Sequence, residues 1–276
     1  MTGQTVPVDT DIGLTGLAVS GLLVAVAVAI SLVRRLGLAR DLVVASVRAV
    51  VQLTIVGVAL ALVVDDDDPL VWAWLWVGAM LLYASHTVRH RAGGDRRVFA
   101  IALAAFTCAA VATLGVLFGL RVFEPTGRAI VPLAGMMVGN SMTATVLASR
   151  RIAEETRDHH SLIEARVALG ATIDEALHPH VRSALRTALV PQIETTKAVG
   201  IVFIPGAMTG LILAGVEPVD AVRVQAAVMY LVLGSVATTT FVMTFGLTRG
   251  MFRRARGERP SFRRRREPDL LPSRRR

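Results

Sequence analysis

Long apolar runs, separated by short polar segments, make up most of the first 250 positions of the chain. A transmembrane helix needs about 20 mostly apolar residues to cross the hydrocarbon core of a bilayer. Seven runs reach or approach this length: Ile12–Val33, Leu42–Val64, Pro69–Val88, Val98–Leu120, Ala129–Ser149, Ala198–Val216 and Val224–Leu247. The pattern therefore predicts an all-α, polytopic membrane protein with about seven transmembrane helices.

The charges of the segments between these runs alternate in sign. The N-terminal segment carries Asp9 and Asp11, the second loop is the aspartate run 65–68, and the first and third loops carry arginines. Because basic residues collect in cytoplasmic loops, we expect the N-terminus outside and the C-terminus in the cytoplasm. We further expect a multi-pass protein of the plasma (cytoplasmic) membrane.

Composition excludes two other classes of protein. Hydrophobic residues make up 53% of the chain and charged residues 18%, which excludes a soluble domain and excludes disorder over most of the chain. The formal net charge is +9, and residues 253–276 hold eleven arginines against three acidic residues. We expect residues 251–276 to be a disordered cytoplasmic tail that binds anionic membrane lipids, with no role for nucleic acid.

The longest polar segment, residues 150–197, separates the fifth and sixth runs. Ser161 with Glu164 and Thr172 with Glu175 have the spacing of capping boxes. The first box predicts a helix over 162–169 that ends at Gly170.

The second capping box predicts another helix from about Ile173, which Pro179 should disturb. A third helix, with Val181, Leu185 and Leu189 on one face, should run to Pro191. These helices would form a compact projection on the cytoplasmic surface.

Part of this segment resembles the EAA loop of ABC-transporter permeases. Glu164 and Ala165 are followed by a glycine, Gly170, and by Pro191 about twenty residues later. The resemblance implies a coupling helix that docks into a groove of a separate ATPase subunit. The residues that it assigns to this contact are Glu164, Ala165, Leu169, Gly170, Ala171 and Thr172.

Further motifs occur in the order found in one family. They are Arg48-Ala-Val-Val-Gln-Leu53, Gly135-Met-Met-Val-Gly-Asn-Ser-Met-Thr-Ala144, Lys197-Ala-Val-Gly200, Ile204-Pro-Gly-Ala-Met-Thr-Gly210 and Ala221-Val-Arg-Val-Gln225. Over residues 12–250 the chain is similar to the FetB-like permeases, which are associated with iron export and have a plant branch linked to aluminium tolerance. The resemblance implies a permease domain over 1–250, a homodimer of permease chains, an ABC ATPase partner and export of iron or another metal.

The chain has no site for ATP of its own. A P-loop requires Gly-Lys-Ser/Thr so that its lysine reaches the β- and γ-phosphates, but the single lysine, Lys197, stands between Thr196 and Ala198. We therefore expect a non-enzymatic subunit that binds no cofactor, with ATP hydrolysed on the partner. Lys197 beside Glu194 should form a local ion pair at the coupling end of the sixth run.

Arg48 and Gln52 are the clearest polar residues inside an apolar run. Their i,i+4 spacing puts both on one face of the helix. A buried arginine is costly in a membrane, so Arg48 should either line the translocation path or contact another helix. Its position near the cytoplasmic end also allows the side chain to reach the interface.

The fifth and sixth runs are the candidates for a translocation path. Asn140 and Thr143 make the middle of the fifth run polar, and Pro205-Gly206 should break the sixth run near its middle. Met208 and Thr209 follow this break. Gly135-x3-Gly139 and Gly206-x3-Gly210 allow close helix approach, and packing alone is an alternative reading of these glycines.

No metal site is evident from the residues alone. The methionines are typical packing residues, and His159, His160, His178 and His180 are expected to be surface side chains. Two other functions stay open: a secondary metal-cation carrier and a membrane scaffold without transport. Proton-coupled carriers usually hold acidic residues within the membrane, whereas the seven runs contain none and Glu194 and Asp220 lie at run edges.

Overall fold

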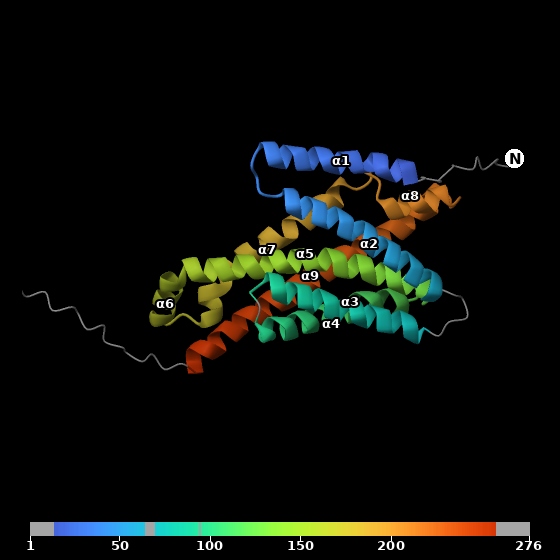
Figure 1. Cartoon of the computed structure of the whole chain (residues 1–276). Helices are drawn as coiled ribbons and strands as arrows, with labels where there is room; N and C mark the ends of the chain where they lie inside the picture. The colour runs from blue at the N-terminus through green and yellow to red at the C-terminus, as the bar shows by residue number, and fades with distance from the viewer. Residues whose placement is uncertain (1–13, 64–69, 94, 258–276) are drawn as a thin grey trace, which may run out of the picture.

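Almost all of the chain that the structure describes is helical, which confirms the all-α prediction (Figure 1). The computed structural model describes residues 14–63, 70–93 and 95–257. Within these ranges the helices are α1 (Leu14–Val33), α2 (Ala39–Val63), α3 (Val71–Arg91), α4 (Arg96–Gly119), α5 (Gly127–Asp158), α6 (His160–Ala168), α7 (Ile173–Ala198), α8 (Gly206–Leu213) and α9 (Pro218–Gly257). The acidic N-terminal segment, the aspartate run and most of the arginine-rich tail lie outside the described residues.

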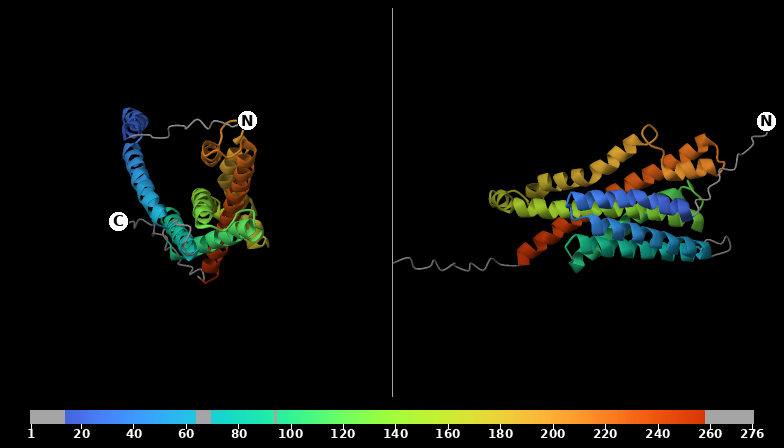
Figure 2. Two further views of the ribbon diagram at one scale, coloured as in Figure 1. Left: turned by 90° about the vertical axis from the view of Figure 1, so that its right-hand side faces the viewer. Right: turned by 45° about the horizontal axis from the view of Figure 1, so that its top comes forward.

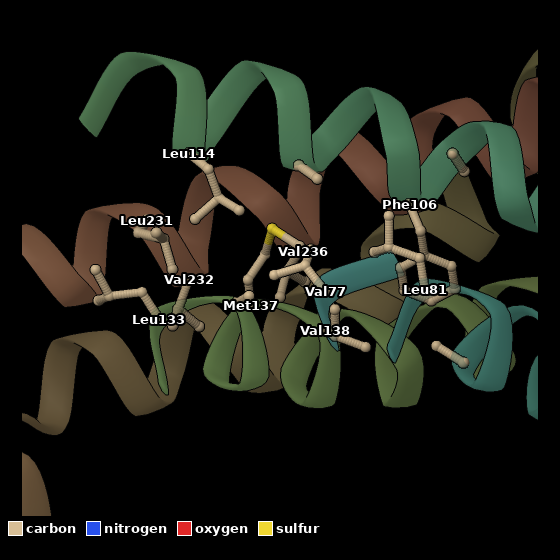
Figure 3. Close-up of a cluster of buried hydrophobic side chains, with 14 of the residues drawn as sticks. Val77, Leu81, Phe106, Leu114, Leu133, Met137, Val138, Leu231, Val232 and Val236 are labelled. Carbon is tan, nitrogen blue, oxygen red and sulfur yellow. The ribbon is translucent and has the colours of Figure 1, made fainter. Parts of the chain in front are cut away.

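Four long helices form the centre of the molecule. Among the described residues α3, α4, α5 and α9 are long and apolar enough to cross a membrane. Their facing side chains make one continuous core, in which Phe106, Leu114, Met137 and Val236 are fully or almost fully buried. Figure 3 shows Met137 of α5 reaching toward Val236 of α9. The number of seven spans and the side of each terminus stay predictions.

The first two helices pack on each other as a hairpin at the edge of this bundle (Figure 2). Most of their apolar side chains are exposed, including Leu23, Leu32, Val47 and Leu53. Exposed aliphatic side chains on a membrane helix face lipid or another protein, because neither contact requires polar groups.

The fifth helix continues beyond its apolar run. Its 32 residues correspond to about 48 Å, against about 30 Å for the hydrocarbon core. After Ser149 it carries charged residues, then turns into α6, and α7 returns antiparallel to it (Figure 1). A second small core of Ile152, Ile163, Leu177 and Leu185 holds these three helices together.

Two expectations for α7 are wrong. The helix is continuous from Ile173 to Ala198 and contains both Pro179 and Pro191, although a break was expected at the first and an end at the second. A proline removes one backbone hydrogen bond. Here Leu177 and Val181 on either side of Pro179 are buried, so packing against α5 outweighs that loss.

The sixth apolar run, Ala198–Val216, is not one helix. Residues 199–205 are non-helical, and α8 has only eight residues, too few to cross a membrane alone. Pro205, in an extended conformation, is the N-cap of α8. The expected break at Pro205-Gly206 is therefore confirmed, whereas a single spanning helix over this run is wrong.

Only one of the two predicted capping boxes forms. Glu175 N donates to Thr172 Oγ1 over 3.3 Å, and Thr172 N donates to Glu175 Oε2 over 2.8 Å. The other prediction is wrong, because α6 begins at His160, two residues earlier than a cap at Ser161 requires, and has no side-chain cap.

Candidate functional site

The functional candidates concentrate at one end of the molecule, where α5 runs past its apolar part into α6 and α7. We call residues 150–189 the hairpin end. Its tip is the turn between α6 and α7, which projects away from the four-helix core (Figure 1). The predicted coupling residues all lie at or beside this turn: Glu164, Ala165, Leu169, Gly170 and Thr172 are exposed and Ala171 is half-buried.

The turn holds a large apolar side chain outward. Gly170 has φ +99°, a left-handed conformation that favours glycine. Gly170 N donates to Val167 O, and Ala171 N donates to Arg166 O over 3.1 Å, so the last carbonyls of α6 are satisfied. Leu169, just before the glycine, is 89% exposed. The tip is thus a tight turn that presents an apolar surface with no partner among the described residues.

Below the tip, a buried carboxylate joins α5 to α7. Glu155 Oε1 accepts hydrogen bonds from Ser183 Oγ over 2.9 Å and forms a 2.7 Å ion pair with Arg151 Nη2. Its other oxygen, Oε2, lies 3.0 Å from His180 Nδ1. We call these residues, with His159, the Glu155 cluster. The hydrogen bonds with His180 and Ser183, followed by the charge of Arg151, hold the pKa of Glu155 below its ordinary value.

The second histidine of the cluster approaches the same oxygen. His159 Nδ1 lies 3.5 Å from Glu155 Oε2, and the imidazole rings of His159 and His180 are 4.9 Å apart. His180 is buried and its Nε2 has no hydrogen-bond partner within residues 14–63, 70–93 and 95–257, whereas the side chain of His159 is 47% exposed. The expectation of a surface histidine is therefore wrong for His180.

Sequence reasoning missed the Glu155 cluster because its members are distant along the chain. Glu155 and His159 have i,i+4 spacing, which was a usable local signal. His180 lies 25 residues after Glu155, and only the fold of the hairpin end brings it near. By contrast His160, 3.6 Å from Glu164, is exposed as expected.

A groove of ≈570 Å³ lies beside the cluster, between α7 and α9. Arg182, Arg186 and His178 line its polar side. Its apolar side is formed by Val181, Leu185, Leu189, Phe241 and Phe245. Because basic side chains here adjoin apolar ones, the groove has the character of a surface at the edge of a membrane.

The predicted path residues do not converge within one chain. Arg48 Nη2 donates to Tyr83 Oη, a contact between α2 and α3, which agrees with the interhelical alternative; a role of Arg48 in the translocation path stays a prediction. Gln52 and Thr143 are exposed. Asn140 is exposed too, and its Nδ2 donates to Met136 O over 2.8 Å within α5.

The remaining path candidates lie around the break before α8. Pro205 and Met208 are half-buried, Gly206 and Thr209 are exposed, and Thr209 Oγ1 donates to Pro205 O over 3.3 Å. No neighbouring atom of the described chain lies within 4 Å of a Cβ built at Gly206. The same holds for Gly139 and Gly210, so no close helix approach occurs there within the described part of one chain.

Glu194 and Lys197 form the expected ion pair, with 2.9 Å between Lys197 Nζ and Glu194 Oε1. Its expected place at the coupling end is wrong. Lys197 lies 24 residues after Ile173, the first residue of α7, which is about 36 Å along the helix. The reason is that α7 continues through both of its prolines and carries this pair away from the tip.

The level of this pair follows from the antiparallel register of α5 and α7. His180 faces Glu155, and Glu194 lies fourteen residues, or about 21 Å, farther along α7. The corresponding position on α5 is Ser141, near the middle of the apolar stretch 129–149. Glu194, just before the run 198–216 in sequence, therefore lies about level with the middle of the apolar stretch of α5 along the helix axis.

Another feature missed by the sequence analysis is a hydroxyl-rich interface between α5 and α9. Ser141 Oγ donates to Ser235 Oγ over 3.3 Å, and both are fully buried. Thr145 and Thr239 continue this interface and bond to carbonyls of their own helices. Small hydroxyl residues allow membrane helices to approach closely, so a structural role explains this polar row.

Comparison with known proteins gives a consistent family. The family described as uncharacterised protein family UPF0014 matches residues 14–252. A rice (Oryza sativa subsp. japonica) relative described as "UPF0014 membrane protein STAR2" is 36% identical over 222 residues, covering 80% of this chain and 78% of the relative.

Two further relatives carry more specific descriptions. "Probable iron export permease protein FetB" of Escherichia coli (strain K12) is 32% identical over 229 residues, covering 83% of this chain and 88% of the relative. "Protein ALUMINUM SENSITIVE 3" of Arabidopsis thaliana is 30% identical over 235 residues, covering 84% and 85%. No solved structure matches the chain.

Proposed function

Because the chain belongs to the UPF0014 family and is a multi-pass membrane permease, we propose that it is the membrane subunit of an ABC transporter that exports iron or another metal cation. The description of the Escherichia coli relative as a probable iron export permease supports the class of substrate. ATP would be bound and hydrolysed on a separate ATPase subunit, because the chain has no P-loop.

One observation carries this proposal: the exposed apolar tip of the hairpin end. Leu169 is 89% exposed on a turn fixed by Gly170, and Leu162 and Val167 of α6 are exposed as well. A short helix at the end of a rigid projection is suited to dock into a groove of another protein, where buried apolar anchors supply most of the affinity.

A second copy of the chain would complete the translocation path. Gln52, Asn140 and Thr143 lie on surfaces that the described part of one chain leaves exposed. Polar side chains in membrane segments usually face a protein interior or a water-filled cavity. A homodimer that encloses these surfaces would satisfy this requirement and would bind two ATPase subunits through its two tips.

Capture of the ATPase tests the proposal. The chain is co-expressed with a P-loop ATPase encoded next to its gene, and the complex is purified through a tag on the permease. We expect the ATPase to co-purify with wild type and to be lost with Glu164→Lys or Gly170→Asp. Glu217→Lys changes an exposed glutamate before α9, far from the tip in sequence, and should retain the ATPase.

One observation favours a second candidate, a secondary metal-cation carrier. Glu194 lies level with the middle of α5, and acidic residues at membrane depth often serve in ion-coupled transport. Reconstitution of the purified chain alone into liposomes separates the two functions. Metal transport driven by a proton gradient without ATP would overturn the ABC proposal, and loss of the ATPase from wild type would do the same.

A further inference from the structure

The Glu155 cluster brings one carboxylate and two imidazoles together from α5, from the residue that follows α5, and from α7. Glu155 Oε2 lies 3.0 Å from His180 Nδ1 and 3.5 Å from His159 Nδ1. The ligand atoms of these residues all lie within 4.8 Å of one another. The two pairs that include Glu155 Oε2 therefore already have the spacing that a single shared ion requires, and the two imidazoles lie within 4.8 Å of each other.

Bond lengths allow a direct comparison. Bonds of about 2.0–2.2 Å from a metal to nitrogen or oxygen place two ligand atoms about 3.3–3.6 Å apart in a tetrahedron and about 2.8–3.1 Å apart at a right angle. The separations of 3.0 and 3.5 Å fall in these ranges. His159 Nδ1 also lies 3.1 Å from the main-chain oxygen of Glu155, so a bound ion would replace that contact and the hydrogen bond between His180 Nδ1 and Glu155 Oε2.

The other side of the carboxylate is held in place. Glu155 Oε1 bonds to Arg151 Nη2 and Ser183 Oγ, so both donors leave Oε2 to the two imidazoles. Outer partners of this kind orient the ligands of metal sites and raise their affinity. The charge of Arg151 opposes a cation, but its 2.7 Å ion pair is with Oε1 and not with Oε2.

We propose that Glu155, His159 and His180 form a binding site for a divalent transition-metal cation of the Fe²⁺ or Zn²⁺ class. Two histidines and one carboxylate are the ligand set of non-haem iron(II) centres and of several zinc centres. Two nitrogen ligands disfavour Ca²⁺ and Mg²⁺, which prefer oxygen. The exposed edge of His159 provides a route for the ion, and positions that the protein leaves open would be filled by water.

The site deepens the proposed function, since it lies between the coupling tip and the spanning part of α5, where a metal exporter could bind its substrate or sense its concentration. Binding itself requires neither ATP nor the ATPase. The chain alone can therefore be tested, and failure of the site is distinguishable from failure of the transporter proposal.

The experiment uses the full-length chain purified in detergent with a tag that contains no histidine. Titration with Co²⁺ monitors visible absorption bands, and competition with Zn²⁺ and with Fe²⁺ under anaerobic conditions gives relative affinities. We expect one ion per chain, and about a tenfold or greater loss of affinity in His159→Ala and in His180→Gln. His159→Ala is the principal variant, because an exposed side chain can be removed without loss of the fold.

His160→Ala is the matched control. His160 also faces a glutamate at i,i+4, but both side chains are mostly exposed, and no third ligand joins them in the part of the chain that the structure describes. The metal affinity of the His160→Ala variant should equal that of the wild-type chain. An affinity unchanged in His159→Ala, or reduced equally in His160→Ala, would overturn the metal site. Metal binding without capture of an ATPase would instead support the metal site and contradict the proposal of an ABC transporter.

Discussion

Glu155 of α5 and His180 of α7 are joined by a 3.0 Å hydrogen bond although 25 residues separate them. The bond is buried and lies where α5 has passed the end of its apolar run. It sets the register of the two antiparallel helices at the hairpin end. The tip and the spanning helices are therefore connected through a polar contact as well as through the small apolar core.

Replacing Glu155 by glutamine should destabilise the hairpin end. The change removes the charge that Arg151 and the two histidines share, and hydrogen bonds to charged groups contribute about 1.5–3 kcal/mol each. We expect a lower Tm in chelator-containing buffer and faster amide exchange in α6 and in the first half of α7.

Glu154→Gln is the control for this prediction. Glu154 is exposed and its distance to Arg151 is 3.9 Å, so its loss should have little effect. Equal effects of the two substitutions, or none in Glu155→Gln, would show that the cluster does not stabilise the hairpin end.

Gly246 should be intolerant of a side chain. A Cβ at this position would overlap Ile101 of α4, and overpacking of a close interface costs about 1–3 kcal/mol. We expect Gly246→Ala to lower the thermal stability of the chain in detergent. Gly234 on the same helix is the comparison, because a Cβ there would meet Thr113 at 3.7 Å, an ordinary contact. Equal tolerance of both substitutions would contradict the close approach of α4 and α9.

The start of α7 should depend on pH through Glu175. The backbone N–H and the hydroxyl of Thr172 donate to its carboxylate and hold the pKa of Glu175 below its ordinary value of 4.5. Because the folded pKa is the lower one, the stabilisation is present above pH 4.5 and is lost as the pH falls through the folded value. Amide exchange of residues 173–176, corrected for intrinsic rates, should therefore rise in acid. Thr172→Ala should show fast exchange of these amides above and below pH 4.5. A pH effect that survives this substitution would exclude the capping box as its cause.

Tyr83 should hold α2 against α3. Its hydroxyl accepts the hydrogen bond of Arg48 Nη2, and contacts between α2 and the central bundle are few, since α2 packs chiefly on α1. Tyr83→Phe should raise amide exchange in α2 around residues 45–52. Tyr230→Phe alters an exposed tyrosine of α9 and should leave α2 unchanged. Unaltered exchange in Tyr83→Phe would indicate that other contacts hold α2.

The polar end of α7 should be reachable from water. Polar residues 192–197 level with the middle of α5 require a hydrated cavity. In a Cys108→Ala background, Lys197→Cys should react with a membrane-impermeant maleimide in liposomes, whereas Leu23→Cys on the apolar surface of α1 should not. Protection of both positions would place the end of α7 in lipid.

Asn140→Ala should reduce transport while ATPase capture persists.

Hydropathy predicted the four central helices because each contains an apolar run of membrane length. It underestimated their extent, since α5 and α9 continue past Ser149 and Leu247, and a helix need not end where the membrane does. The turn at Gly170 was predictable from one residue with a special backbone conformation. The continuity of α7 and the pairing of Glu155 with His180 were not, because both depend on tertiary contacts that outweigh local sequence signals.

The length of α9 has a mechanical consequence. Its 40 residues form a rod of about 60 Å, and proline occurs only at its first position, where a helix tolerates it. The same rod packs against α4, α5, α7 and α8. Because this one helix contacts four others, a change in the tilt of α9 would shift all four interfaces together and with them the central bundle.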